Sequence, residues 1–160
     1  MTDITTGAAR QSRTRARATS HGTKLRPSGQ DVCDWIEGKG QFDKDPSQPR
    51  CYALRVPEGK LVGKPVDLAA FQRRFICEVY DNPYGTRRAF LSFGRKNGKT
   101  ALAGFLLLNH LCGPSSRQNS QLFSTAQSRE QAAILFQLAA KVVRMSPDLR
   151  SVITIRSAVG

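Results

Sequence analysis

The feature that most constrains the fold is an alternation of short apolar runs with helical stretches in the second half of the chain. The apolar runs have the length of strands and lie at 89–93, 121–126 and 152–155. The helical stretches between them lie at 101–112 and from Ser128 to about Met145. Strands that alternate with helices favour right-handed crossovers and a parallel sheet with helices on its faces. We therefore expect an α/β fold built on a parallel sheet with flanking helices.

Capping and stop signals give the boundaries of the expected helices. A short helix is predicted at 31–37 and a second at 68–80, with Asp67 as its N-cap. The apolar face of the second helix is expected to hold Leu68, Phe71, Phe75 and Val79, while Arg73, Arg74 and Glu78 face elsewhere. Ser128 and Gln131 have the spacing of a capping box, and the helix after them should bury Ala132, Leu135, Phe136, Ala139 and Val143.

Composition changes along the chain suggest three parts. Residues 1–30 are rich in Arg, Ser, Thr and Gly with few large apolar residues, which predicts a disordered basic tail. Residues 31–85 form a lead-in segment that includes a loop at 38–50 and a short extended piece at 61–66. Residues 86–160 contain the alternating strands and helices. Asp81 to Gly85 is predicted to be a turn.

The charge of the chain is strongly positive. Lys and Arg number 25 against 12 Asp and Glu, a net charge of +13. A surplus of this size favours a polyanionic partner such as nucleic acid or nucleotide phosphates, although a solvated surface is the simpler explanation. The longest apolar stretch, 105–112, is shorter than the roughly 20 residues of a membrane span, and no apolar segment follows the basic N-terminus as in a secretory signal. The four cysteines contain no CxxC pair, which is typical of a reduced cytosolic protein rather than a zinc ribbon.

The loop between the first apolar run and the apolar helix carries the chemistry. Its sequence is Gly94-Arg95-Lys96-Asn97-Gly98-Lys99-Thr100. Backbone N–H groups at the start of a helix bind phosphate, and a glycine such as Gly98 allows a close approach of the backbone. Lys99 would reach the β- and γ-phosphates of a nucleotide, and the Thr100 hydroxyl would be a ligand of Mg²⁺. The full GxxxxGK[ST] pattern is not met, because Phe93 stands where its first glycine belongs, so a basic surface turn is the alternative.

Several motifs together resemble the large terminase subunit of tailed bacteriophages, the ATPase that drives DNA into the capsid. Residues 95–100, RKNGKT, match the deviant Walker A loop of that family. Upstream, 58–65 and Leu68-Ala69-Ala70-Phe71-Gln72 are similar to two further family segments. Downstream, Thr125-Ala126 and Gln131-Ala132 fit the strand end and the following helix. The resemblance covers about residues 31–155, with its motifs in the family's order.

The resemblance implies a role for particular residues. It makes Gln72 the glutamine that reads adenine, with Phe71 packed beside the base. It gives Lys99 and Arg95 catalytic roles, Arg95 as a group that stabilises charge on the γ-phosphate, with general attraction to phosphate or DNA as the alternative. The implied cofactors are ATP and Mg²⁺, and residues 94–100 are the candidate cofactor-binding set, with Thr100 at the metal. The fold implied is that of a P-loop NTPase. Arg87 and Arg88, before the first apolar run, are either DNA contacts or a solvated strand end.

The acidic residues that such an ATPase needs are not evident in the chain. After Thr100 the only acids are Glu130, at a helix start, and Asp148, in an expected loop, and neither ends an apolar strand as a Walker B acid does. We therefore expect an N-terminal fragment of a terminase large subunit, without the Walker B strand or the family's nuclease domain. By itself it should bind nucleotide weakly and not turn over ATP. A helicase-like P-loop ATPase and a non-enzymatic basic DNA-binding remnant are the alternatives.

The resemblance also implies partners and a place of action. They are double-stranded phage DNA, the terminase small subunit and the portal protein, with a homo-oligomeric ring for the full-length subunit. The location implied is the cytoplasm of the infected bacterial host, with no membrane partner.

Overall fold

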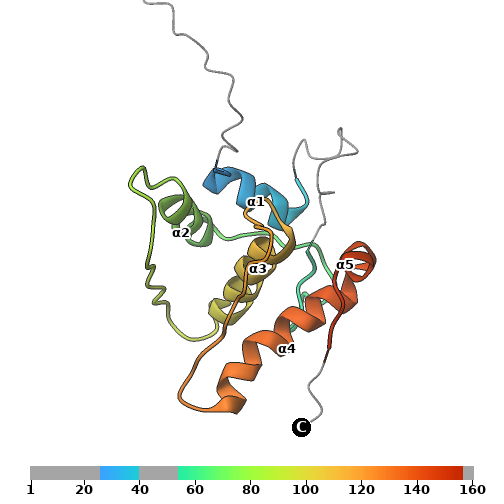
Figure 1. The fold of residues 1–160 in the computed structure, drawn as a ribbon. Coiled ribbons are helices and arrows are strands. Elements are labelled where there is room, and N and C mark those ends of the chain that lie inside the picture. The colour runs from blue at the N-terminus through green and yellow to red at the C-terminus, as the bar shows by residue number, and fades with distance from the viewer. Residues whose placement is uncertain (1–25, 40–53, 157–160) are drawn as a thin grey trace, which may run out of the picture.

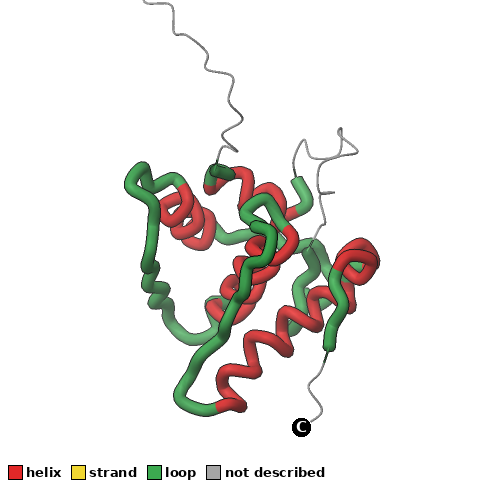
Figure 2. The backbone as a smooth tube through the Cα atoms, viewed as in Figure 1, coloured by secondary structure: helices red, strands yellow, loops and turns green. Residues whose placement is uncertain are grey.

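A computed structural model describes residues 26–39 and 54–156, and these residues form helices joined by turns and extended segments (Figures 1 and 2). The helices are α1 (Gly29–Glu37), α2 (Ala70–Tyr80), α3 (Lys99–Cys112), α4 (Arg129–Met145) and α5 (Pro147–Val152). Within the described ranges the only β-bridge is an isolated antiparallel one between Arg55 and Pro65. None of the described helices is long and apolar enough to cross a membrane.

Helix α3 lies at the centre of the fold, as its apolar sequence predicts. It packs against α4 on one side and against α1 on another, while α2 packs on α1 and α5 on α4. Leu102, Phe105 and Leu108 of α3 are at most 5% exposed, because helices lie on more than one of its sides. Gly113 ends α3, as predicted. The helix that starts at the candidate phosphate loop is therefore held in place by burial of its apolar side chains.

Helix α1 is confirmed and is capped at both ends. Ser28 Oγ accepts the N–H of Asp31, the Asp31 carboxylate accepts the N–H of Ser28, and Gly38 ends the helix in the left-handed region. The helix buries Val32, Cys33, Trp35 and Ile36 completely. It begins at Gly29, two residues inside the segment expected to be a tail; residues 1–25 of that segment lie outside the described residues, as do residues 40–53 of the expected loop.

The three predicted strands are not strands in this structure, so the parallel sheet is not confirmed. Residues 89–93 and 121–126 are extended, but they pair with no other described segment, and Phe90 and Phe123 are 90% and 80% exposed. Val152 ends α5 and residues 153–156 continue without pairing. An apolar run becomes a strand only where a neighbouring strand accepts its backbone hydrogen bonds, and the described residues supply none.

The piece predicted to be extended at 61–66 is mostly a turn. Gly59 and Gly63 have φ angles of +90° and +82°, so the chain reverses between them, and only Pro65 joins the isolated bridge. The turn predicted at 81–85 is confirmed, with the N–H of Gly85 bonded to the carbonyl of Asn82.

Helix α2 exists where predicted, but its start and its buried face differ from the prediction. The N-cap is Ala69, not Asp67, because the N–H of Leu68 is bonded to Glu37 and the chain stays extended to Ala69. Leu68 is buried and Phe75 packs against the core as predicted, but Phe71 is 43% exposed and the completely buried residue of α2 is Ile76, which the prediction did not include. Helical spacing alone did not show which side of the helix meets α1.

Helix α4 keeps its predicted start at Ser128, whose hydroxyl accepts the N–H of Gln131. The structure buries Ala139 and Val143 as predicted, together with Leu138, Ala140 and Val142, but leaves Phe136 half exposed. Ser146 ends α4, and Pro147 then begins the short helix α5 instead of a loop. Pro is favoured in the first turn of a helix, where its missing N–H has no partner to lose.

The described cysteines, Cys33, Cys77 and Cys112, are free thiols. Cys77 lies on α2 where it faces the first residue of α1. A Cβ atom added at Gly29 would stand 2.4 Å from Cys77 Cα. Only glycine therefore permits α1 and α2 to approach this closely.

This contact predicts that Gly29→Ala destabilises the fold. The new methyl group overlaps backbone atoms, so α1 and α2 must separate, at a cost of about 2 kcal/mol in the free energy of unfolding. Urea denaturation of the variant measures it. The neighbouring Gln30→Ala, which changes an exposed side chain, is the control, and equal stability of the two variants would contradict this packing.

Candidate nucleotide-binding site

The polar loop at 94–98 leads directly into α3. Gly98 is the N-cap of the helix, with φ 69° and ψ 24°, and its carbonyl accepts the N–H of Leu102 at 2.9 Å. No side chain caps the helix and its first turn holds no acid. The first N–H groups of α3 consequently lack intrahelical partners and lie at the positive end of the helix dipole, an arrangement that binds anions.

Two residues of the loop have left-handed backbone conformations. Lys96 has φ 68° and Gly98 has φ 69°. For a residue with a side chain this conformation costs about 1–2 kcal/mol, and such strain is concentrated at functional sites. Turns that contain left-handed residues can gather backbone N–H groups into a concave anion site. The loop therefore has features of phosphate-binding loops beyond its sequence.

The charged side chains of the loop are exposed. Lys99 Nζ donates to the carbonyl oxygen of Phe93 at 2.8 Å, so this side chain folds back across the loop toward the segment before it. Arg95, Lys96 and Thr100 are all exposed, Thr100 in the first turn of α3. The cationic groups and the hydroxyl are thus available to a ligand at the start of the helix.

The structure brings α2 to the same loop. Gln72 Nε2 donates to the carbonyl oxygen of Asn97 at 3.4 Å. The same nitrogen would lie 3.4 Å from a Cβ atom added at Gly98. The Phe71 ring meets the Phe93 ring edge to face, with centroids 4.8 Å apart. The two residues predicted to contact adenine therefore lie beside the loop, although 25 residues separate Gln72 from Asn97 in the chain.

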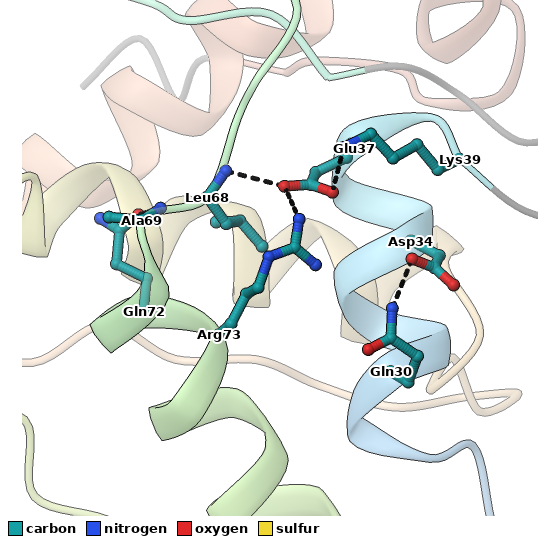
Figure 3. Close-up of polar contacts among 8 residues, drawn as sticks. All are labelled: Gln30, Asp34, Glu37, Lys39, Leu68, Ala69, Gln72 and Arg73. Atoms are coloured by element: carbon teal, nitrogen blue, oxygen red, sulfur yellow. Dashed lines mark hydrogen bonds and ion pairs between the residues drawn. The ribbon is translucent and has the colours of Figure 1, made fainter.

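A buried carboxylate that the sequence did not point out supports the start of α2 (Figure 3). Glu37, the last residue of α1, has a fully buried side chain whose Oε1 accepts the N–H of Leu68 at 2.8 Å and an N–H of the Arg73 guanidinium. Its Oε2 lies 3.1 Å from Lys39 Nζ as an ion pair, without hydrogen-bond geometry. The sequence predicted that Arg73 faces away from the core, and the structure instead turns it toward α1. Nothing in local spacing signals a pair 36 residues apart.

The contacts of Glu37 set its charge. Burial raises the pKa of a carboxyl group, but here the hydrogen bonds from Leu68 N–H and Arg73, helped by Lys39, outweigh burial and lower the pKa of Glu37. The same hydrogen bond to Glu37 raises the pKa of Arg73. Both groups are therefore charged at neutral pH.

The described residues offer little for a metal ion. No group of three or more His, Cys, Asp or Glu side chains in the described ranges could hold one. Thr100 supplies one hydroxyl oxygen, so bound phosphates and water would have to complete an Mg²⁺ shell, as is usual for this ion. Glu130 and Asp148 lie in the first turns of α4 and α5, which places Asp148 in a helix and not in a loop.

Helix N–H groups, a lysine and a threonine hydroxyl at the start of a helix are the groups with which P-loop proteins bind nucleotide phosphates. The comparisons with known proteins agree. The family model "Terminase large subunit, ATPase domain" matches residues 70–158. The chain belongs to the terminase large subunit family.

A curated relative and a solved structure give the same assignment. The chain is 56% identical over 100 residues to the terminase large subunit of Enterobacteria phage HK97, a match that covers 62% of this chain and 20% of the relative. It also matches the crystal structure of the HK97 bacteriophage large terminase with a TM-score of 0.65 and 44% identity, over 81% of this chain and 23% of that one. The matches thus span about a fifth of the length of these relatives. The likeness gives the chain a P-loop-type fold in general, without confirming the parallel sheet.

The lowered pKa of Glu37 predicts how stability depends on pH. Its contribution is complete above the pKa of an unfolded glutamate, about 4.3, and is lost as the pH falls through the lower folded value. Glu37→Gln should therefore be less stable than the wild type by about 3 kcal/mol at pH 7, since it breaks a buried ion pair. The deficit should shrink below pH 4.

Urea denaturation at pH 7 and across pH 2.5–5 measures the difference. Glu78→Gln, which breaks the exposed Arg74–Glu78 pair, serves as the control and should leave the free energy of unfolding nearly unchanged, because solvent screens this pair. A deficit for Glu37→Gln that is the same at every pH would contradict the charged pair.

Proposed function

We propose that residues 94–100 bind the phosphates of ATP with Mg²⁺, as the nucleotide-binding part of a DNA-packaging ATPase. The observation that carries the proposal is the meeting of the α3 N-terminus, Lys99 and Gln72 at one place in the structure. Gly94 to Thr100 cradle the phosphates, Lys99 contacts the β- and γ-phosphates, and Thr100 is a ligand of Mg²⁺. Arg95 stabilises charge on the γ-phosphate. Gln72 reads adenine, with Phe71 beside the base.

The domain division and the wider role are part of the same proposal. Residues 31–85 bring the adenine-contacting helix to the loop, and 86–160 supply part of a P-loop ATPase domain. In a longer terminase large subunit this region would power DNA movement, with the small subunit and the portal as partners, in the host cytoplasm. The family match does not favour the helicase-like alternative or the non-enzymatic remnant.

Support for a nucleic-acid partner comes from a basic hollow at the other end of α3. The hollow has a volume of about 670 Å³, and Arg26, Arg87 and Arg117 line it together with Tyr84 and His110. None of its described lining residues carries a carboxylate. Its α3 residue, His110, lies eleven residues beyond Lys99, which places the hollow about 17 Å along the helix from the loop. Guanidinium groups in a concave surface suit the phosphodiester backbone of DNA.

The nucleotide proposal predicts a thermal shift that depends on Lys99. At a hundredfold excess of ATP·Mg²⁺ over its Kd, binding should stabilise the wild type by about 2.7 kcal/mol and raise its Tm. Lys99→Ala should lose most of this rise, because the loop loses its phosphate contact. Lys60→Ala, which removes an exposed lysine from the turn at 59–63, should keep it. An equal Tm rise in Lys99→Ala and the wild type would contradict the proposal.

The DNA proposal predicts a change in salt dependence. Affinity for a short duplex, followed by fluorescence anisotropy, should fall linearly with the logarithm of salt concentration. Removing two phosphate contacts with Arg87→Ala and Arg117→Ala together should reduce that slope by about 1.8. The control pair Arg144→Ala and Arg150→Ala removes the same charge from α4 and α5, outside the hollow. The same reduction of the salt slope in both double variants would show that DNA affinity depends only on net charge and not on the hollow, and would contradict the proposal.

A further inference from the structure

The start of α2 is held to α1 at one buried point. Glu37 Oε1 accepts the N–H of Leu68 at 2.8 Å, two residues before the helix, and also bonds to Arg73 in its first turn. The Glu37 side chain is fully buried and that of Arg73 is 30% exposed. One carboxylate therefore fixes both the backbone that enters α2 and a side chain on its first turn (Figure 3).

Gln72 lies between the Glu37 contacts and the loop at 94–98. It directly precedes Arg73, and its Oε1 accepts the N–H of Ala69 at 3.1 Å. Its Nε2 is the atom that donates to the Asn97 carbonyl at 3.4 Å. Both ends of the amide are thus held, one by the entry to α2 and the other by the loop. A rotation of the first turn of α2 would move the amide away from the loop.

We propose that Glu37 is a positioning residue for nucleotide selectivity: through Leu68 and Arg73 it fixes the first turn of α2 so that the Gln72 amide faces the loop. This inference rests on the proposed ATP site. The hydrogen-bond and ion-pair partners of Glu37 are Leu68, Arg73 and Lys39, and none of them belongs to the loop. The effect of Glu37 passes to the base through Gln72, and the phosphate contacts of the loop and α3 do not depend on it.

The separation of base and phosphate contacts provides the test. Glu37→Gln keeps an oxygen for the N–H of Leu68 but removes the charge that holds Arg73. Binding of ATP·Mg²⁺ and of inorganic tripolyphosphate·Mg²⁺ is measured by calorimetry on the full chain. Affinity for ATP should fall about tenfold, the equivalent of about 1.4 kcal/mol, while affinity for tripolyphosphate stays within about twofold. Gln72→Ala should show the same unequal loss.

Two further variants complete the design. Glu78→Gln breaks the exposed Arg74–Glu78 pair on the same helix and should leave both affinities unchanged. Arg73→Lys keeps a positive charge beside Glu37 without the guanidinium geometry, so a smaller but still unequal loss is expected. It serves as the test variant if Glu37→Gln does not fold.

The outcomes are distinguishable. An equal loss of ATP and tripolyphosphate affinity would show that Glu37 only supports the fold, and would overturn the inference while leaving the proposed function in place. Unchanged ATP affinity in folded Glu37→Gln would overturn it too. If the wild type binds neither probe, the proposed function is wrong and the inference falls with it.

Discussion

A single buried carboxylate, Glu37, determines how the segments around the loop at 94–98 are joined. A charge in a protein interior is tolerated only where it is paired and hydrogen-bonded, and here a backbone N–H, a guanidinium and an ammonium group meet that requirement. Because those partners come from the end of α1, from the entry to α2 and from its first turn, satisfying the charge fixes the position of one helix relative to the other. Gln72 and Phe71 take their places beside the loop as a consequence.

Helix α3 provides the second support of the site. Its apolar residues pack against α1 and α4, and this packing fixes the position of its N-terminus, where Gly98, Lys99 and Thr100 lie. The loop itself is exposed. At the far end Asn109, buried inside this apolar helix, donates to Tyr80 of α2 and to Ser115 of the following loop. Helix α2 is therefore linked to the C-terminal end of α3 through Tyr80 and to the loop before α3 through Gln72.

The local parts of this arrangement could be predicted from the sequence, while the pairings between distant segments could not. The signals that specify these helices lie within a turn or two: α1 has a serine cap and a glycine stop, α3 an apolar run with a glycine stop, and α4 a serine cap and apolar periodicity. The strands failed as predictions because an apolar run such as 89–93 becomes a strand only beside a partner, and the described residues leave Phe90 and Phe123 in solvent. The N-cap of α2 moved from Asp67 to Ala69 because Glu37, 31 residues away from Leu68, takes the N–H that fixes the chain there.

The sequence by itself determined that this chain carries a basic, glycine-containing loop at the start of an apolar helix, and its motifs were enough to indicate the terminase family. Those features depend on residues that are neighbours in the chain, and a helix start needs no distant partner to present its N–H groups. Only the tertiary structure decided that Glu37 and Arg73 form a pair, that Lys99 folds back to Phe93, and that Gln72 touches Asn97. Each of these contacts depends on how α1, α2 and α3 pack. The spacing of residues along a helix does not determine which helix face is buried, and the packing of the helices does.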